Sequence, residues 1–402
     1  MKPEVMKPES IYTGKFMFVV ALVLGVVAAA TPLAQAQTFS VVHNFSGGSD
    51  GGVPYNGFTM KGKMFYGTAS VGGTANAGVF FKMNEKGEET VLHNFTGGAD
   101  GANPEGELIK DKSGSFYGTT TAGGAAGAGT VFQVTGKKET VLYSFAGGTD
   151  GAIPVAGLTM DAAGNLYGTT SQGGANGNGT VFELAAPKTK GGSWTESILY
   201  SFGTGTDGSV PIGGVSFDAA GNLYGTNSAG GSYGYGTVFQ LVPGTPWTEN
   251  ILHEFQNADD GSVPYAGLVS DSKGNFYGAA TQGGANGGGT VFELTSSGGT
   301  WTFTVVYSVP GWGISGTFRN LVLDASGNIY ATTHCDGAYN AGTVYELSPS
   351  GGNWTYNLLY NFTGGADGQY SVSNLVLSEG KLYGTTLFGG ANGNGVVYEV
   401  TP

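Results

Sequence analysis

The chain has 402 residues and a formal net charge of −13, yet only 11% of its residues carry a charge. An acidic chain of this kind is a poor partner for nucleic acid, whose phosphates attract basic surfaces. Glycine supplies 76 residues, which would indicate disorder if hydrophobic residues did not make up 40% of the chain. The single cysteine, Cys335, excludes an internal disulfide.

Residues 1–36 have the features of a secretory signal peptide in the expected order. Lys7 and Lys15 precede an apolar run over residues 16–30, and Ala-Gln-Ala at 34–36 is typical of a cleavage site. We therefore expect a mature chain that starts near residue 37, is secreted or periplasmic, and has no stable membrane insertion after cleavage. An uncleaved membrane anchor is the alternative, although the apolar run is short for a bilayer span.

A tyrosine-centred tetrapeptide recurs along the rest of the chain at intervals of about fifty residues. Its tyrosines are Tyr66, Tyr117, Tyr167, Tyr224, Tyr277, Tyr330 and Tyr383. This period is typical of β-propellers, in which each repeat forms one four-stranded blade. The repeats therefore predict that residues 37–402 form a single domain.

The third repeat contains four β-prone segments separated by turn residues. They lie at residues 154–161, 165–170, 180–184 and 194–202, and we name them strands A, B, C and D. An Asp and a Gly mark the turn between A and B, because Asp can hydrogen-bond the turn and Gly tolerates a positive φ. The repeat thus predicts one antiparallel four-stranded blade.

The two ends of the mature chain are complementary. Residues 38–45 resemble strand D, whereas residues 395–400 resemble strand C. If the N-terminal strand D joins the last strands A, B and C, the ring closes without exposed sheet edges. The predicted fold is all-β, a seven-bladed β-propeller of four-stranded antiparallel blades closed in this way, and we expect a monomer. A parallel β-helix is the alternative, but repeats with four short strands fit it poorly.

Two segments of the third repeat carry a family resemblance. The run LYGTTSQGGANGNGTVFEL at residues 166–184, followed by WTESILYSFGTGTDG at residues 194–208, resembles the Gloeo/Verruco-type tandem repeat. Proteins with this repeat are exported bacterial proteins of undefined activity. The resemblance therefore implies export more than any particular chemistry.

Two repeated loop patterns are expected to lie on one face of the propeller, which is where propellers usually place function. The D-to-A connections read Gly-Gly-x-Asp-Gly, and the B-to-C loops read Gly-Gly-x-Asn-Gly-x-Gly. A ring of calcium sites would use the six carboxylates of the first pattern, which are Asp50, Asp100, Asp150, Asp207, Asp260 and Asp367. Calcium takes six to eight oxygen ligands, so one carboxylate per blade falls short. We therefore interpret these aspartates as turn residues and expect no metal and no cofactor.

The sixth repeat departs from the others in both of its loops. Its D-to-A connection contains Trp312 and lacks the Asp-Gly pair, while its B-to-C loop contains His334, Cys335 and Asp336 in place of Gly-Gly. Arg319, the only arginine, begins its strand A where the other repeats have small residues. We predict a ligand site formed by these five residues, with Asp336 as a candidate partner for the buried guanidinium. Ordinary drift of one repeat is the alternative.

Three functional hypotheses follow from the absence of a recognisable catalytic motif. The leading one is a non-catalytic binding or surface-interaction module for a glycan or a protein. Four tryptophans near the start of strand D could stack on sugars or pack between blades, namely Trp194, Trp247, Trp301 and Trp354. The second is a lyase or glycosidase with His334 as general base and Arg319 as an electrostatic clamp. The third is a structural spacer in an extracellular assembly.

Overall fold

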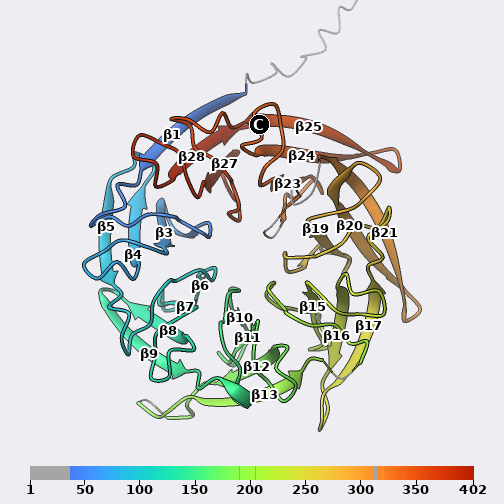
Figure 1. Ribbon diagram of the computed structural model, residues 1–402, viewed down its shortest axis with the longest axis horizontal. Coiled ribbons are helices and arrows are strands. Elements are labelled where there is room, and N and C mark those ends of the chain that lie inside the picture. The colour runs from blue at the N-terminus through green and yellow to red at the C-terminus, as the bar shows by residue number, and fades with distance from the viewer. Residues whose placement is uncertain (1–36, 190, 204, 312–315, 318, 320) are drawn as a thin grey trace, which may run out of the picture. The chain divides into compact units, whose positions relative to one another are not determined.

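The computed structural model describes residues 37–402 except 190, 204, 312–315, 318 and 320, so the predicted signal segment lies outside the described residues. The strands form seven four-stranded antiparallel sheets arranged in a ring (Figure 1). The fold is therefore the seven-bladed β-propeller that the repeats predict. Helical structure in this part of the chain is limited to the single turn η1 (Gly148–Asp150), and no helix there has the length and apolar character needed to cross a membrane.

Blades one to six each consist of four consecutive strands, with strand A near the ring axis and strand D at the outer edge (Figure 1). Blade one contains β2 (Thr59–Lys61), β3 (Met64–Ala69), β4 (Val79–Asn84) and β5 (Glu89–Asn94). Blade two contains β6 (Ile109–Lys110), β7 (Phe116–Thr120), β8 (Thr130–Thr135) and β9 (Lys138–Ser144). Blade three contains β10 (Thr159–Met160), β11 (Leu166–Thr170), β12 (Thr180–Ala185) and β13 (Thr195–Ser201).

The next three blades repeat this order. Blade four contains β14 (Ser216–Phe217), β15 (Leu223–Asn227), β16 (Thr237–Val242) and β17 (Thr248–Glu254). Blade five contains β18 (Val269–Ser270), β19 (Phe276–Ala280), β20 (Gly287–Ser297) and β21 (Thr300–Pro310). Blade six contains β22 (Val322–Leu323), β23 (Ile329–Thr332), β24 (Thr343–Ser350) and β25 (Asn353–Asn361).

The seventh sheet combines the two ends of the described chain. Its strands are β26 (Val376–Ser378), β27 (Lys381–Thr385), β28 (Val396–Thr401) and β1 (Thr38–Asn44). Strand β1 pairs antiparallel with β28, from Thr38 opposite Thr401 to Asn44 opposite Val396. The N-terminal strand thus occupies the outer position that strand D occupies in the other sheets.

Strand A is much shorter than the sequence predicts. In blade three, residues 154–161 were expected to form it, but only Thr159 and Met160 pair with β11. Pro154 has no amide hydrogen to donate, and Ile153 before it has a φ of 57°, so this segment begins as a turn. The innermost part of the blade is therefore irregular backbone that lines the axis.

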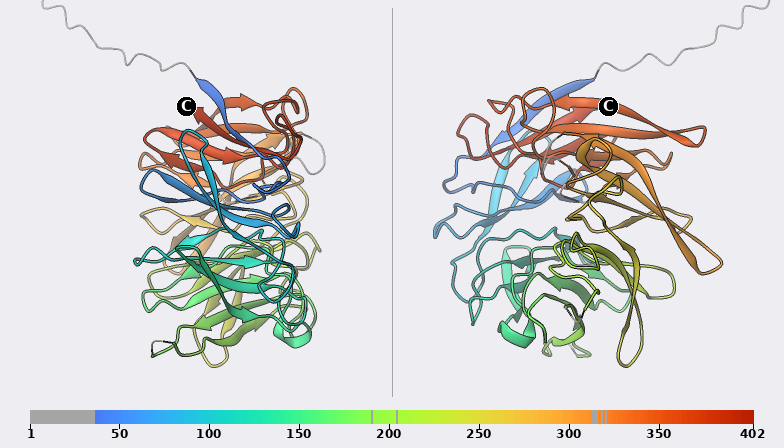
Figure 2. Two further views of the ribbon diagram at one scale, coloured as in Figure 1. Left: turned by 90° about the vertical axis from the view of Figure 1, so that its left-hand side faces the viewer. Right: turned by 45° about the vertical axis from the view of Figure 1, so that its right-hand side comes forward.

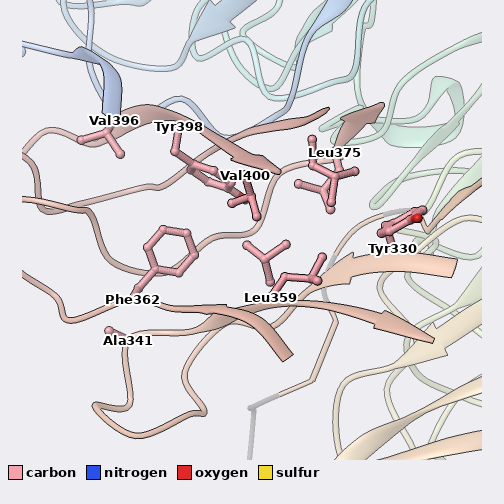
Figure 3. Close-up of a cluster of buried hydrophobic side chains, with 10 residues drawn as sticks. Tyr330, Ala341, Leu359, Phe362, Leu375, Val396, Tyr398 and Val400 are labelled. Carbon is pink, nitrogen blue, oxygen red and sulfur yellow. The ribbon is translucent and has the colours of Figure 1, made fainter. Parts of the chain in front are cut away.

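Neighbouring blades pack through buried apolar side chains. Figure 3 shows one such cluster, in which Tyr330 and Leu359 of blade six meet Leu375, Tyr398 and Val400 of blade seven. Each sheet is buried on both faces in this way, and every residue of strand B is accordingly buried in blades two to five. In the side views of Figure 2, the connecting loops lie on the two opposite faces of the ring.

Backbone turns with positive φ tie each blade to the one before it. The residue six positions before strand A lies in the left-handed region in six blades, as Val53, Asn103, Ile153, Val210, Val263 and Tyr370. Its amide donates to a B-to-C loop of the preceding blade; Val53 N, for example, donates to Asn394 O at 2.9 Å. A left-handed conformation is strained for β-branched residues, so the surrounding contacts must hold it in place. Because the same left-handed residue recurs at the equivalent position in six blades, it is a feature of the repeat and does not indicate a functional site.

Candidate functional site

The D-to-A connections and the B-to-C loops share one face, as the sequence predicts. Isolated bridges join them in six blades, for example Ala152 with Gln172 and Ser262 with Gln282. We call this side the loop face. The A-to-B turns and C-to-D hairpins lie at the opposite ends of the strands, and we call that side the hairpin face.

The six aspartates that were interpreted as turn residues rather than calcium ligands each hold the turn in which they lie. Asp100 shows the arrangement, since its Oδ2 accepts a hydrogen bond from Thr96 N at 2.9 Å and lies 3.3 Å from His93 Nε2. Comparable bonds link the other five to their own connections: Asp50 to Ser46, Asp150 to Ala146, Asp207 to Gly203, Asp260 to Gln256 and Asp367 to Thr363. These contacts are those of turn residues.

The outer strands also meet across the gaps between blades, which we call seams. Each strand D has a bulge, which in β9 shifts the register between Val141 and Tyr143. Because one extra residue reverses the face to which later side chains point, Glu139 faces the seam with β5 of blade one, and Tyr143 faces the seam with β13 of blade three. Each strand D therefore contributes one side chain to the seam on either side of it.

Four seams are closed by a carboxyl pair beside a His or Tyr, and we call them carboxyl seams. Their members are His43, Asp50 and Glu89; His93, Asp100 and Glu139; Tyr143, Asp150 and Glu196; and Tyr200, Asp207 and Glu249. Burial, reinforced by the Asp charge, raises the pKa of Glu89 and Glu249 to about 8 and that of Glu139 and Glu196 to about 7. These glutamates therefore hold a proton near neutral pH.

The other three seams are closed by stacked rings, and we call them aromatic seams. The ring centroids of His253 and Phe303 lie 3.6 Å apart with an angle of 6° between the planes. Tyr307 stacks on Tyr356 and Tyr360 on Phe39, at 5.0 Å and 3.7 Å. The glutamates that face these positions in the carboxyl seams were not identified from the sequence. The sequence nevertheless contains a pattern that could have identified them. Each lies at the second position of an eight-residue strand D segment that ends in Phe, and the four are Glu89, Glu139, Glu196 and Glu249.

Arg319 lies on the ring axis, between two wider cavities. On the loop-face side, a cavity of about 240 Å³ is lined by Tyr55, Tyr265 and Arg319, with aliphatic side chains and Ser171. Below it, Arg319 and Glu107 border a space of about 20 Å³, which has room for about one water molecule. Glu107 also lines the next cavity, of about 230 Å³. Arg319 and Glu107 thus form a polar plug across the axis.

The guanidinium of Arg319 is held by residues from blades one and two. It is 8% exposed and lies 4.6 Å from the centre of the Tyr55 ring, a cation–π geometry. Burial lowers the pKa of Arg319, while Tyr55, Glu105 and Glu107 act in the opposite direction. Burial raises the pKa of Glu107 to about 7, against the opposing effects of its hydrogen bond from Asn374 and of Arg319. The plug is therefore a cation facing two carboxyl groups with raised pKa values.

The structure corrects the expectation that Asp336 pairs with Arg319. Asp336 is buried and accepts a hydrogen bond from Thr333 Oγ1 within its own blade. Its charge raises the pKa of Tyr307 and Tyr356, after the larger effect of burial on each. These tyrosines close the seam between blades five and six, whose D-to-A connection lacks the usual Asp. Asp336 thus supplies a carboxylate near the seam between blades five and six, where the usual aspartate of the D-to-A connection is missing.

His334 and Cys335 of blade six are not among the residues that line the axial cavity. His334 packs on Tyr370, with ring centroids 4.5 Å apart, and its amide donates to Gly316 O at 3.3 Å. Cys335 is partly buried, and burial raises the pKa of its thiol. Trp312 lies outside the described residues. Of these five residues, Arg319 is the one that lines the axial cavity among the residues described there.

Two grooves on the hairpin face contain the tryptophans that were candidates for sugar contact. The first, of about 730 Å³, is lined by Trp301, Tyr224, Asp218, Gln240 and Asn250, among others, between blades four and five. The second, of about 510 Å³ between blades five and six, includes Trp354, Tyr277, Asp271, Lys273 and Asp324.

The tryptophans also pack between blades. Trp301 lies edge-on to Tyr224 and Trp354 edge-on to Tyr277, with ring centroids 5.4 Å and 6.3 Å apart. Trp194 lies similarly against Tyr117, and Trp247 packs against the cluster that includes Tyr167. Trp301 and Trp354 therefore each pack between two blades and also form part of the surface of a groove.

Solved structures share the fold at low sequence identity. The extracellular domain described for a hybrid two-component system of B. thetaiotaomicron aligns with 91% of this chain and 42% of its own, with a TM-score of 0.59 and 12% identity. An ulvan lyase of polysaccharide lyase family PL25 aligns with 90% of this chain and 95% of its own, with a TM-score of 0.51 and 11% identity. A protein described as a 6-phosphogluconolactonase from Bacteroides uniformis aligns over 80% and 88%, with a TM-score of 0.52 and 15% identity. Identities this low show the fold alone.

The sequence comparison identifies the family. No curated protein matches the chain. The Gloeobacter/Verrucomicrobia repeat matches it twice, over residues 23–218 and 212–402, which together cover both halves of the propeller. The chain therefore belongs to the Gloeobacter/Verrucomicrobia repeat family.

Proposed function

We propose that this protein is an exported, non-catalytic propeller that binds glycans in the tryptophan-lined grooves of its hairpin face. The observation that carries the proposal is the groove of about 730 Å³ in which Trp301 lies among polar side chains. Its volume is in the range of small-ligand sites, and a related groove lies beside Trp354. The predicted signal peptide supports export.

The chemistry of the first groove matches that of a sugar. The indole of Trp301 offers an apolar ring surface, on which the C–H face of a pyranose can stack. Around it, Tyr224 OH donates to Asp218 at 2.9 Å and accepts from Gln240 Nε2 at 2.6 Å. Oriented carboxylate and amide groups of this kind can bond to sugar hydroxyls. A ring surface bordered by fixed polar groups favours a glycan over an apolar ligand.

Retention of the mature protein on immobilised polysaccharides tests this proposal. The double variant Trp301→Ala/Trp354→Ala should lower affinity for a retained polysaccharide at least tenfold while the protein stays folded. The matched control is Tyr233→Ala/Tyr339→Ala, which removes aromatic rings that are 54% and 61% exposed on the loop face. Loss of binding only in this control pair would place the ligand on the other face. Absence of retention across a broad panel of polysaccharides would overturn the proposal and favour a structural spacer.

A lyase or glycosidase acting at the axis is the second candidate. The observation that favours it is the cavity of about 240 Å³ that contains Arg319, together with the pKa of about 7 for nearby Glu107. A carboxyl group that titrates near neutral pH suits general acid–base catalysis, and a guanidinium suits an acidic sugar. Release of reducing ends from acidic polysaccharides, lost in Glu107→Gln, would support it. If that variant cleaves the polysaccharide as fast as the wild type, Glu107 has no such role.

A further inference from the structure

The first carboxyl seam combines three metal-binding side chains from two separate strands. His43 lies on β1, Asp50 on the connection after β1, and Glu89 on β5. One ligand atom from each lies within 4.8 Å of the other two. The three residues therefore bring together one imidazole and two carboxylates at the junction between the N-terminal strand and blade one.

The distances in this cluster suit a small tetrahedral cation. His43 Nε2 lies 3.4 Å from Glu89 Oε2 and 3.6 Å from Asp50 Oδ2. Zinc bonds to nitrogen and oxygen are about 2.0–2.1 Å long, so a tetrahedral site holds its ligand atoms about 3.3–3.4 Å apart. The same separations are longer than ordinary hydrogen bonds. The two distances from His43 Nε2 thus fit ligands arranged around a shared cation better than direct pairing.

Unsatisfied polar atoms in the cluster point to a missing partner. The side chain of Glu89 is 7% exposed, and its Oε1 has no hydrogen-bond partner among the described residues, a feature shared by the glutamates of the other three carboxyl seams. His43 Nε2 is also buried without a hydrogen bond there. Buried polar atoms are normally satisfied, so each exception requires an explanation. A cation bound by His43 Nε2 and Glu89 Oε2 would satisfy the imidazole nitrogen, which is unsatisfied at His43 but not at the equivalent His93.

Neighbouring contacts hold the ligands in place. Asp50 Oδ2 accepts a hydrogen bond from Ser46 N at 2.9 Å and keeps a second lone pair available. The ring of His43 packs edge-on against Phe45, with centroids 4.9 Å apart. Supporting contacts of this kind orient metal ligands and raise affinity.

We propose that His43, Asp50 and Glu89 form a zinc site that links the N-terminal strand of the ring to blade one. Imidazole nitrogen and carboxylate oxygen are both ordinary zinc ligands, and water would complete a tetrahedral shell. The site is structural, because its ligands come from β1 and β5, which lie in different sheets. It lies at an outer seam and is independent of glycan binding in the hairpin-face grooves.

The other seams provide natural comparisons. The second carboxyl seam has the same residue types, but its His93 Nε2 lies 3.3 Å from Asp100 Oδ2 and can pair with it directly. Among the described residues, only the first seam brings three ligand atoms within 4.8 Å of one another. The third and fourth carboxyl seams have Tyr143 and Tyr200 in place of the histidine. His43→Tyr therefore introduces a side chain that this position already accommodates elsewhere in the ring.

Zinc titration of metal-stripped mature protein tests the proposal, with bound zinc measured by mass spectrometry and stability by thermal unfolding. The wild type should bind one zinc ion and unfold at a higher temperature with zinc than with calcium or magnesium. His43→Tyr and Glu89→Gln should each lower zinc affinity at least about 100-fold.

The control His93→Tyr should keep the affinity and the stabilisation of the wild type. If His43→Tyr binds zinc as tightly as the wild type, or if His93→Tyr alone abolishes binding, the proposed site is wrong. If zinc binds but stabilises the wild type and His43→Tyr equally, the link between β1 and blade one is also excluded. Both tyrosine variants should melt cooperatively without metal, which separates loss of binding from loss of folding.

Discussion

The carboxyl seams and the aromatic seams occupy equivalent places around the ring but hold the blades together by different physical means. At a carboxyl seam, a buried glutamate such as Glu249 keeps its proton beside Asp207. At an aromatic seam, His253 and Phe303 stack with almost parallel rings. The first arrangement responds to pH near neutrality, whereas the stack of Phe39 on Tyr360 at another aromatic seam does so far less. The same position in the repeat thus accepts either a protonated glutamate or an aromatic ring, provided that the side chain fills the seam and leaves no unpaired charge there.

Strand β1 takes part in both kinds of seam, so its removal gives the largest expected effect. Phe39 stacks on Tyr360 on one side, and His43 faces Glu89 on the other. A chain that begins at Gly51 should lose both contacts and expose the edge of β28. We expect the unfolding temperature to fall by more than about 10 °C, with aggregation visible by size-exclusion chromatography. Unchanged melting and a monomeric elution profile would contradict this.

The axis offers a third arrangement, in which a cation faces two carboxyl groups. Arg319→Ala should leave Glu105 and Glu107 without the guanidinium and destabilise the fold by about 3 kcal/mol at pH 8. The loss should be smaller at pH 5, because both carboxyl groups can then be protonated. Arg319→Lys should fall between the wild type and the alanine variant, since Lys keeps the charge but not the planar group. Denaturant unfolding at the two pH values measures these differences, and equal losses at pH 5 and pH 8 would contradict the account.

Converting one kind of seam into the other tests the comparison directly. Phe303→Glu places a carboxyl group opposite His253 and Asp260, as in the first two seams. We expect a loss of about 1–2 kcal/mol at pH 8, because the stacked ring is replaced by a carboxyl group that is partly buried. The loss should shrink toward pH 5, where the new group is protonated. Phe303→Leu keeps an apolar side chain and should show no such pH dependence in thermal unfolding.

The smallest expected effect concerns the pH dependence of a single carboxyl seam. Glu249 ionises near its usual pKa of 4.5 when unfolded but holds its proton to about pH 8 when folded, facing Asp207 and Tyr200. The folded state binds more protons between these values, so this group makes stability fall as the pH rises from about 5 to 8. Glu249→Gln should therefore raise the unfolding temperature at pH 8 by about 1–2 °C and leave it nearly unchanged at pH 5.

The control for this measurement is Glu379→Gln, at an exposed ion pair with Lys63. That variant should follow the wild type at both pH values, because solvent screens an exposed charge. A Glu249→Gln protein that is less stable than the wild type at pH 8 would show that the carboxyl group is ionised and stabilising there.

The amino-acid sequence by itself determined the blade and the number of blades. Alternating apolar residues and turn residues act over a few positions, and the repeat period counts the units without reference to their packing. The paired loop types of the loop face follow from the order of the strands. The turn role of aspartates such as Asp100 was predictable for the same reason, because its bonds are to residues nearby in the chain.

The tertiary structure alone decided which side chains meet across the seams and at the axis. His43 and Glu89 lie on strands of different sheets, and the bulge in each strand D determines which seam a side chain faces. Arg319 meets Tyr55 from blade one although the sequence suggested Asp336 from its own blade. Local patterns do not encode such contacts, because they depend on ring curvature and on a shift of one residue in register.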